Sequence, residues 1–167
     1  MTTETPSPAL LWKRMSEDQR LRAADAFWRE ADSADQQVEA MVLLAQKLKA
    51  RPRYIATLPV EKKARHLAHY TGMPDVLAAR LLVSYHLGHQ RPMMAAFLDA
   101  LGITHEDGLI KEESVKPDAG KVGPAAEQIA KQFPPDDVRI YLTTLICQDP
   151  ETWGALDETV KGFEAAR

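Results

Sequence analysis

The stretch of sequence that decides the fold is residues 74–87, PDVLAARLLVSYHL. Pro74 and Asp75 are typical of a helix start, because proline fits the first turn and a carboxylate there interacts favourably with the helix dipole. From Val76 to Leu87 the residues are apolar on nearly every side, and a helix of this kind is buried by its neighbours. The stretch therefore predicts a central helix with other helices packed around it.

Two amphipathic helices are expected before this stretch. Ser16, followed by two acidic residues, is a good N-cap for the first of them. The second is predicted from a stripe of apolar residues at helical spacing, which ends before Pro52: Val38, Met41, Val42, Ala45 and Leu48. Such a stripe normally packs against the core, so we expect these side chains to be buried.

Prolines mark where most of the remaining helices begin. Pro59, Pro92, Pro124 and Pro135 each stand just before or within the first turn of a predicted helix, and a last helix is expected near Trp153. Residues 138–146, VRIYLTTLI, also have the composition of a β-strand. We favour a helix there, because the chain offers no convincing partner strand.

These elements predict an all-α fold, a globular bundle of about seven or eight helices. Residues 1–8 are expected to form a disordered tail and 9–167 a single helical domain. Residues 103–123, rich in glycine and with little periodicity, are expected to form a long loop, either a lid or an ordered surface loop.

A weak internal repeat accompanies this pattern. Three times an acidic cap precedes a strongly apolar helix, which a proline and a short helix then follow; the caps are Asp35, Asp75 and Asp136. One interpretation is a stacked helical array similar to a short α-solenoid. The alternative is that any all-α protein produces such a rhythm, and the unequal spacing of the prolines favours this alternative.

Composition excludes several classes of protein. In a chain of 167 residues, 45% hydrophobic and 27% charged residues are typical of an ordinary globular protein. The net charge of −3 gives no global reason to expect nucleic acid or an anionic membrane as partner. Cys147 is the single cysteine, so no internal disulfide forms, and neither a signal peptide nor a membrane-spanning run is evident. We expect a cytoplasmic protein.

The sequence contains two His-x-x-His pairs, His66 with His69 and His86 with His89. The i, i+3 spacing places both imidazoles of a pair on one side of a helix, so two pairs on facing helices could bind a metal. We expect the two helices to form an antiparallel hairpin around Gly72. At about 1.5 Å per residue, this hairpin separates His69 from His86 by roughly 16 Å.

A separation of this size is too large for one metal ion, whose nitrogen ligands lie about 2 Å from it. We therefore predict no metal site and no cofactor, with His86 and His89 as the candidates should a metal bind. His66 and His69 are expected on the surface, and His86 and His89 half buried.

A third histidine, His105, is followed directly by Glu106 and Asp107. Carboxylates raise the pKa of a neighbouring imidazole, and such a group on a loop can act as a general base. Adjacent loop residues more often face water separately, and no nucleophile accompanies these three. A small metal-binding protein or enzyme using His86, His89 or His105 is accordingly a minor hypothesis, and no catalytic residue is assigned.

Positive charge is concentrated in residues 47–66, which hold seven lysines and arginines against the single acid Glu61. The candidates for binding an anion or a partner are Lys49, Arg51, Arg53, Lys62, Lys63 and Arg65. This basic cluster could bind a phosphate or a nucleic-acid backbone, or it could meet the acidic remainder of a second copy. The third interpretation is an ordinary solvated helix end.

The function expected from these observations is a non-catalytic helical module that binds or scaffolds proteins, with a homodimer as one form of it. The first alternative is an anion or nucleic-acid binder acting through the basic cluster. The sequence contains none of the glycine-rich, metal-ligating or nucleophile signatures that would name a reaction. Partners are therefore expected to be proteins, with nucleic acid less favoured and membranes excluded.

Overall fold

The computed structural model describes residues 6–30, 33–111 and 116–165. It is 78% helical, and within these ranges it has 11 helices and one two-stranded hairpin, so the all-α prediction is confirmed. The helices outnumber the seven or eight expected because α1, α4 and α10 are short. None of the helices described is both long enough and apolar enough to cross a bilayer.

The chain separates into two compact units, where the sequence predicts one domain over 9–167. The first is Ser7–His89, and the second covers the chain from Gln90 onward. The boundary lies between two consecutive helices, α6 and α7. In the second occurrence of the predicted repeat, α6 is the apolar helix and α7 is the short helix that follows the proline. The boundary therefore divides this occurrence between the two units.

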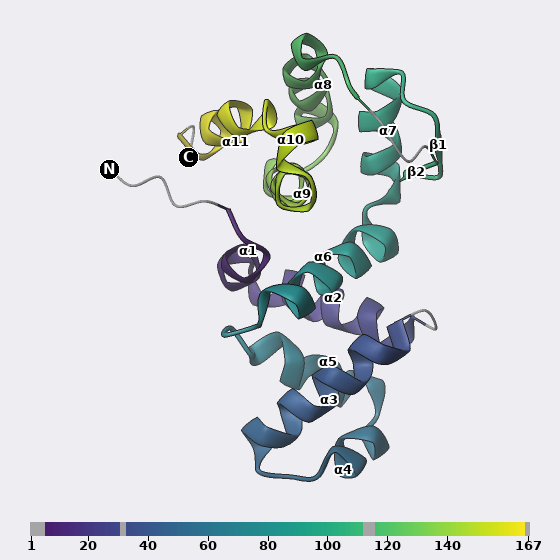
Figure 1. The fold of residues 1–167 in the computed structure, drawn as a ribbon, viewed down its shortest axis with the longest axis vertical. Coiled ribbons are helices and arrows are strands. Elements are labelled where there is room, and N and C mark those ends of the chain that lie inside the picture. The colour runs from purple at the N-terminus through teal and green to yellow at the C-terminus, as the bar shows by residue number, and fades with distance from the viewer. Residues whose placement is uncertain (1–5, 31–32, 112–115, 166–167) are drawn as a thin grey trace. The chain divides into compact units, whose positions relative to one another are not determined.

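The first unit contains six helices (Figure 1): α1 Pro8–Arg14, α2 Glu17–Arg29, α3 Ala34–Leu48, α4 Pro52–Thr57, α5 Val60–His69 and α6 Asp75–His89. Helix α2 is its centre, because α5 and α6 both pack against it. α1 packs on α6, and α3 packs on α4 and α6. Of the tail expected over 1–8, residues 1–5 lie outside the described ranges, whereas Ser7 caps α1 and Pro8 begins it.

Local chemistry explains why the helices of this unit end where they do. Ser16 and Gln19 form a reciprocal capping box that starts α2. The last carbonyls of α5 are satisfied by side chains from elsewhere in the unit: Trp12 Nε1 donates to Tyr70 O at 2.8 Å, and Arg20 Nε donates to Ala68 O at 2.8 Å. These bonds tie α1 and α2 to the end of α5.

Helix α6 is the central helix that residues 74–87 predict. Its buried residues are Leu77, Ala78, Leu81, Leu82, Ser84, Tyr85 and His86. Near its end it approaches α2 closely, since a Cβ added at Gly88 would lie 2.9 Å from the Cβ of Ala26. Val76, in its first turn, is 74% exposed and is the exception to the predicted burial.

The second unit contains α7 Arg91–Leu101, α8 Ala119–Gln132, α9 Pro135–Gln148, α10 Pro150–Trp153 and α11 Leu156–Ala165. Every residue from Val138 to Ile146 is buried, and α8, α10 and α11 all pack on α9. The preference for a helix over a strand in this stretch is confirmed. Buried residues surround the α9 axis on all sides, and six of these nine residues are apolar, so the pattern resembles that of a buried strand.

The region 103–123, expected to be a long loop, contains a short hairpin and the start of a helix. Strands β1 His105–Glu106 and β2 Leu109–Ile110 are antiparallel and are joined by Asp107 and Gly108, whose φ angles are 51° and 90°. Two successive positive φ angles define the type I′ turn, which Asp-Gly favours. Residues 112–115 lie outside the described ranges, and α8 begins at Ala119, so Pro124 lies inside this helix.

Candidate functional site

Helix α3 presents to solvent most of the stripe that the sequence assigns to the core. Val38 is 53% exposed, Val42 42% and Leu48 40%. The residues of α3 that are buried are Ala40, Leu44 and Ala45. The predicted burial of the stripe is therefore wrong for these three residues, because α3 packs through the side that carries Ala40, Leu44 and Ala45 and leaves both valines outside.

A shallow hollow lies between this exposed side of α3 and the beginning of α6. Its lining residues are Glu39, Val42, Leu43, Gln46, Pro74, Val76 and Leu77, and its volume is ≈ 170 Å³. Pockets for drug-sized ligands are about 300–1,000 Å³, so this hollow has the size for an apolar side chain rather than for a substrate. It extends the apolar surface of α3 onto α6 through Val76.

The charged residues on this side of α3 are sorted by sign along the helix. Asp35 and Glu39 are exposed near its N-terminal end, and Lys49 is exposed at its C-terminal end. At about 100° per residue, positions 35, 38, 39, 42 and 46 fall on one side of the helix, and Lys49 is the C-cap that directly follows it. We name this surface the α3 face: Asp35, Val38, Glu39, Val42, Gln46 and Lys49.

The charges of the α3 face are not compensated within the molecule. Among the described residues, Asp35, Glu39 and Lys49 have no ion-pair partner. A carboxylate in the first turn of a helix and a cation at its C-terminal end suit the helix dipole, which explains the sign of Asp35 and Lys49 but not that of Glu39. The arrangement leaves a surface that is acidic at one end, apolar in the middle and basic at the other.

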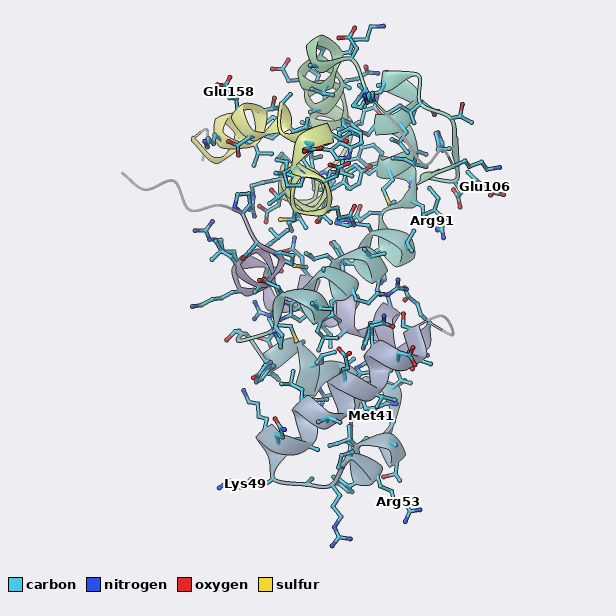
Figure 2. The ribbon with its side chains drawn as sticks, in the orientation of Figure 1. Met41, Lys49, Arg53, Arg91, Glu106 and Glu158 are labelled. Carbon is cyan, nitrogen blue, oxygen red and sulfur yellow. The ribbon has the colours of Figure 1, made fainter. Side chains whose placement is uncertain are left out.

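The basic cluster extends the positive end of this surface onto α4 and α5. Lys49, Arg51, Arg53, Lys62 and Arg65 are exposed, and none of them has an acidic partner in the ranges that the structure describes. The one acid of the segment, Glu61, pairs instead with Arg29 at 3.3 Å. In Figure 2, Lys49 and Arg53 project from opposite sides of the end of the unit that α4 occupies.

Two lysines of the predicted segment pack on aromatic rings. Lys63 Nζ lies 4.8 Å from the ring centre of Trp28, and Lys47 Nζ lies 4.5 Å from that of Tyr70. Cation–π contacts of this kind contribute about 0.5–1 kcal/mol at exposed sites. Lys63 therefore has a packing role, and the candidates that extend freely into solvent are the other five.

The environments of the two histidine pairs agree with the prediction for His69 and differ from it for His66, which is half-buried, and for both members of the second pair. His86 is buried, with 3% of its surface exposed, whereas His89 is exposed because it is the last residue of α6. His69 is exposed, and its Nε2 lies 3.4 Å from Glu17 Oε1. The expected hairpin of α5 and α6 is not what separates the pairs, since both helices pack mainly on α2.

Burial governs the protonation of His86. Removal from water disfavours the charged imidazole and lowers the pKa of His86 from 6.5 to about 3. The described part of the chain contains no group of three His, Cys, Asp or Glu side chains arranged to hold a metal ion. The metal hypothesis thus gains no support from the geometry, and metal analysis of the purified protein tests it directly.

His105 and the two acids after it do not converge on a common point. His105 Nε2 lies 2.7 Å from Asp99 Oδ1, and the amide of Gly108 donates to His105 Nδ1 at 3.1 Å. Glu106 pairs with Lys111 and Asp107 with Arg91, each at 3.6 Å. Asp99 and Arg91 belong to α7, so these two contacts fasten the hairpin to that helix, which is a structural role for the histidine.

A second hollow, of ≈ 420 Å³, lies on the other unit between α8 and α11. It is open, and its polar lining consists of Glu127, Glu158 and Thr159. Two carboxylates without a third ligand or an opposing cation specify neither a metal nor a reaction. This hollow therefore does not compete with the α3 face as a candidate site.

Comparison with protein-family models, curated proteins and solved structures gives no match to this chain. Function is therefore argued from the surface chemistry alone. The sequence identifies the basic end of that surface but misses Val38, Val42 and Val76 as functional candidates. The available signal was that α3 carries two apolar sides, one of alanine and leucine and one of valine.

Proposed function

We propose that this chain is a non-catalytic helical module that binds another protein surface through the α3 face. The observation that supports the proposal is the exposure of Val38, Val42 and Val76, because Val42 and Val76 line the same apolar hollow and Val38 lies one helical turn before Val42. Scattered exposed apolar residues are common, whereas a continuous patch bordered by charges is typical of an interaction site.

The chemistry of the face defines the partner it fits. Complete burial of a valine contributes about 1.5–3 kcal/mol, and roughly 1 kcal/mol of this remains for each half-exposed valine here. Charges at the rim mainly set orientation and association rate. The fitting partner is a protein surface with an apolar centre, cations facing Asp35 and Glu39, and carboxylates facing Lys49.

Photo-crosslinking in the native cells tests this proposal. A photoreactive phenylalanine analogue at position 42 should give crosslinked products whose partner is identified by mass spectrometry. The matched control is position 109, because Leu109 is 43% exposed against 42% for Val42 and lies in the hairpin of the other unit. Crosslinks from position 42 that are absent from position 109 support the proposal. Equal crosslinking from both positions, or none from position 42, contradicts it.

A second candidate function is the binding of a polyanion through the basic cluster. It is supported by the lack of acidic partners for Lys49, Arg51, Arg53, Lys62 and Arg65 within the described chain. It ranks second because Lys63 packs on Trp28 and because Lys49 and Arg53 project apart (Figure 2), which suits diffuse contacts better than a phosphate pocket.

Heparin chromatography distinguishes this candidate. If it is correct, retention at low salt is strong and decreases on replacing Arg51, Arg53, Lys62 and Lys63 with alanine. Negligible retention of the wild-type chain eliminates it.

We also propose that the protein acts in the cytoplasm, which the single Cys147 supports.

A further inference from the structure

The surface that the α3 face fits best is its own copy, and we propose that two chains associate through it as an antiparallel, two-fold symmetric dimer centred on Val42. The inference rests on the proposed function and names its partner. In a two-fold dimer the same patch contributes from both chains, so the patch must be complementary to itself when reversed. The α3 face meets this condition in the charges at its two ends.

Sequence spacing along α3 provides the symmetry. Asp35 and Lys49 are each seven residues from Val42, and Val38 and Gln46 are each four residues from it. At about 1.5 Å per residue, Asp35 and Lys49 lie roughly 10 Å to either side of Val42 along the axis. When two α3 helices pack antiparallel around a two-fold axis at Val42, the acidic end of each helix therefore lies opposite the basic end of the other.

Charge complementarity follows from this arrangement. Asp35 of each chain faces Lys49 of the other, and Glu39 lies one turn closer to the axis on the same side. Asp35 and Lys49 have no ion-pair partner within the described chain, so the dimer supplies a partner for each of them. Glu39 comes opposite position 45 of the other chain, beside the uncharged Gln46, and gains no cation there. A parallel pairing would instead place like charges opposite each other, which disfavours it.

The apolar centre of the dimer uses the hollow beside α3. Val42 faces its own copy at the axis, and Val76 lies at the border of the same hollow. α3 has 15 residues, which corresponds to a contact roughly 22 Å long. An interface of this size lies at the small end of specific interfaces, so we expect dissociation in the micromolar range.

Sedimentation equilibrium of the full chain, from low to several hundred micromolar, tests the dimer. Wild-type protein should convert from monomer to dimer, with weaker association at high salt because the end charges are screened. Val42→Asp places two carboxylates together at the axis and should weaken association by roughly 100-fold or more. Leu109→Asp, a matched substitution in the hairpin, should leave association unchanged.

Charge exchange tests the antiparallel register. Asp35→Lys alone, or Lys49→Asp alone, creates two like-charge contacts per dimer and should weaken association by roughly ten-fold. The double variant restores opposite charges across the interface and should recover most of the wild-type affinity. Circular dichroism confirms that each variant is folded, so that loss of association is not loss of structure.

An independent readout uses engineered cysteines in a Cys147→Ser background. Two residues at a two-fold axis come close enough to form a disulfide, so Val42→Cys should give a covalent dimer under mild oxidation and Leu109→Cys should not. A chain that stays monomeric throughout, a dimer that tolerates Val42→Asp, or a double charge variant without recovery overturns the inference. In the first two cases, crosslinks from position 42 to a different protein would leave the proposed function standing.

Discussion

His86 shows how one buried side chain couples this fold to pH. Its imidazole is neutral in the folded protein, because burial lowers its pKa to about 3. In the unfolded chain the same group titrates near 6.5. Between these two values the unfolded chain binds a proton that the folded protein does not, so acid favours unfolding.

We predict that the free energy of unfolding decreases as the pH falls below 6.5. For a histidine with these two pKa values, the free energy of unfolding is about 2 kcal/mol lower at pH 5 than at pH 7.5. Urea unfolding at the two pH values measures it. Replacement of His86 with glutamine should remove most of this loss, although it also changes the stability at neutral pH.

The matched control for this prediction is His89→Gln. His89 belongs to the same His-x-x-His pair and the same helix but is exposed. Its replacement should leave the acid sensitivity of the wild-type chain in place. An equal decrease in acid sensitivity for both variants would contradict the assignment to His86.

At the scale of single elements, the end of α3 is held in an unusual conformation. Lys49 is its C-cap and has a φ of 53°, in the left-handed region that favours glycine. A side chain other than glycine, asparagine or aspartate in this region costs about 1 kcal/mol. The cation at this position is therefore present despite a local energetic cost.

Lys49→Gly should raise the free energy of unfolding by about 1 kcal/mol, because glycine relieves the strained backbone. Thermal or urea unfolding of dilute, monomeric protein measures the change. Lys49→Ala is the control, since it removes the same charge without relieving the backbone. Equal stabilisation by the two variants would assign the effect to charge and contradict the prediction.

The elements also show what the sequence can and cannot predict. Helices α2, α6, α7 and α9 are found close to where caps, prolines and periodicity place them. The pair Asp107 and Gly108 is a recognisable sequence signal for the type I′ turn found there. When Gly108 is considered only as part of a glycine-rich segment, it suggests a loop instead. Short helices such as α4 contain too few residues for periodicity to reveal them.

The orientation of α3 is the part of the candidate site that sequence cannot supply. Periodicity identifies Val38 and Val42 as one apolar stripe but does not say what the stripe packs against. In the structure α3 packs on α4 and α6, and the residues it buries are Ala40, Leu44 and Ala45. The basic end of the α3 face could be predicted because charged residues can be read directly from the sequence. Its apolar centre could not be predicted, because the exposure of Val38 and Val42 depends on how α3 packs.

At the scale of the whole molecule, the α3 face lies entirely within the unit Ser7–His89. The other unit is built around α9 and carries its own hairpin, in which Leu109 is exposed. The two units therefore offer an internal comparison, because one bears the proposed binding surface and the other a matched apolar residue outside it. This division makes the central claim testable in a single experiment on the intact chain.

That experiment is a concentration series of amide and methyl nuclear magnetic resonance spectra on isotope-labelled wild-type protein. We predict concentration-dependent shifts at the amides of the α3 face and at the methyl groups of Val38, Val42 and Val76, with those of Leu109 and of α9 unchanged. Spectra that do not change with concentration, or shifts that centre on the hairpin, would contradict the claim that two chains meet through the α3 face.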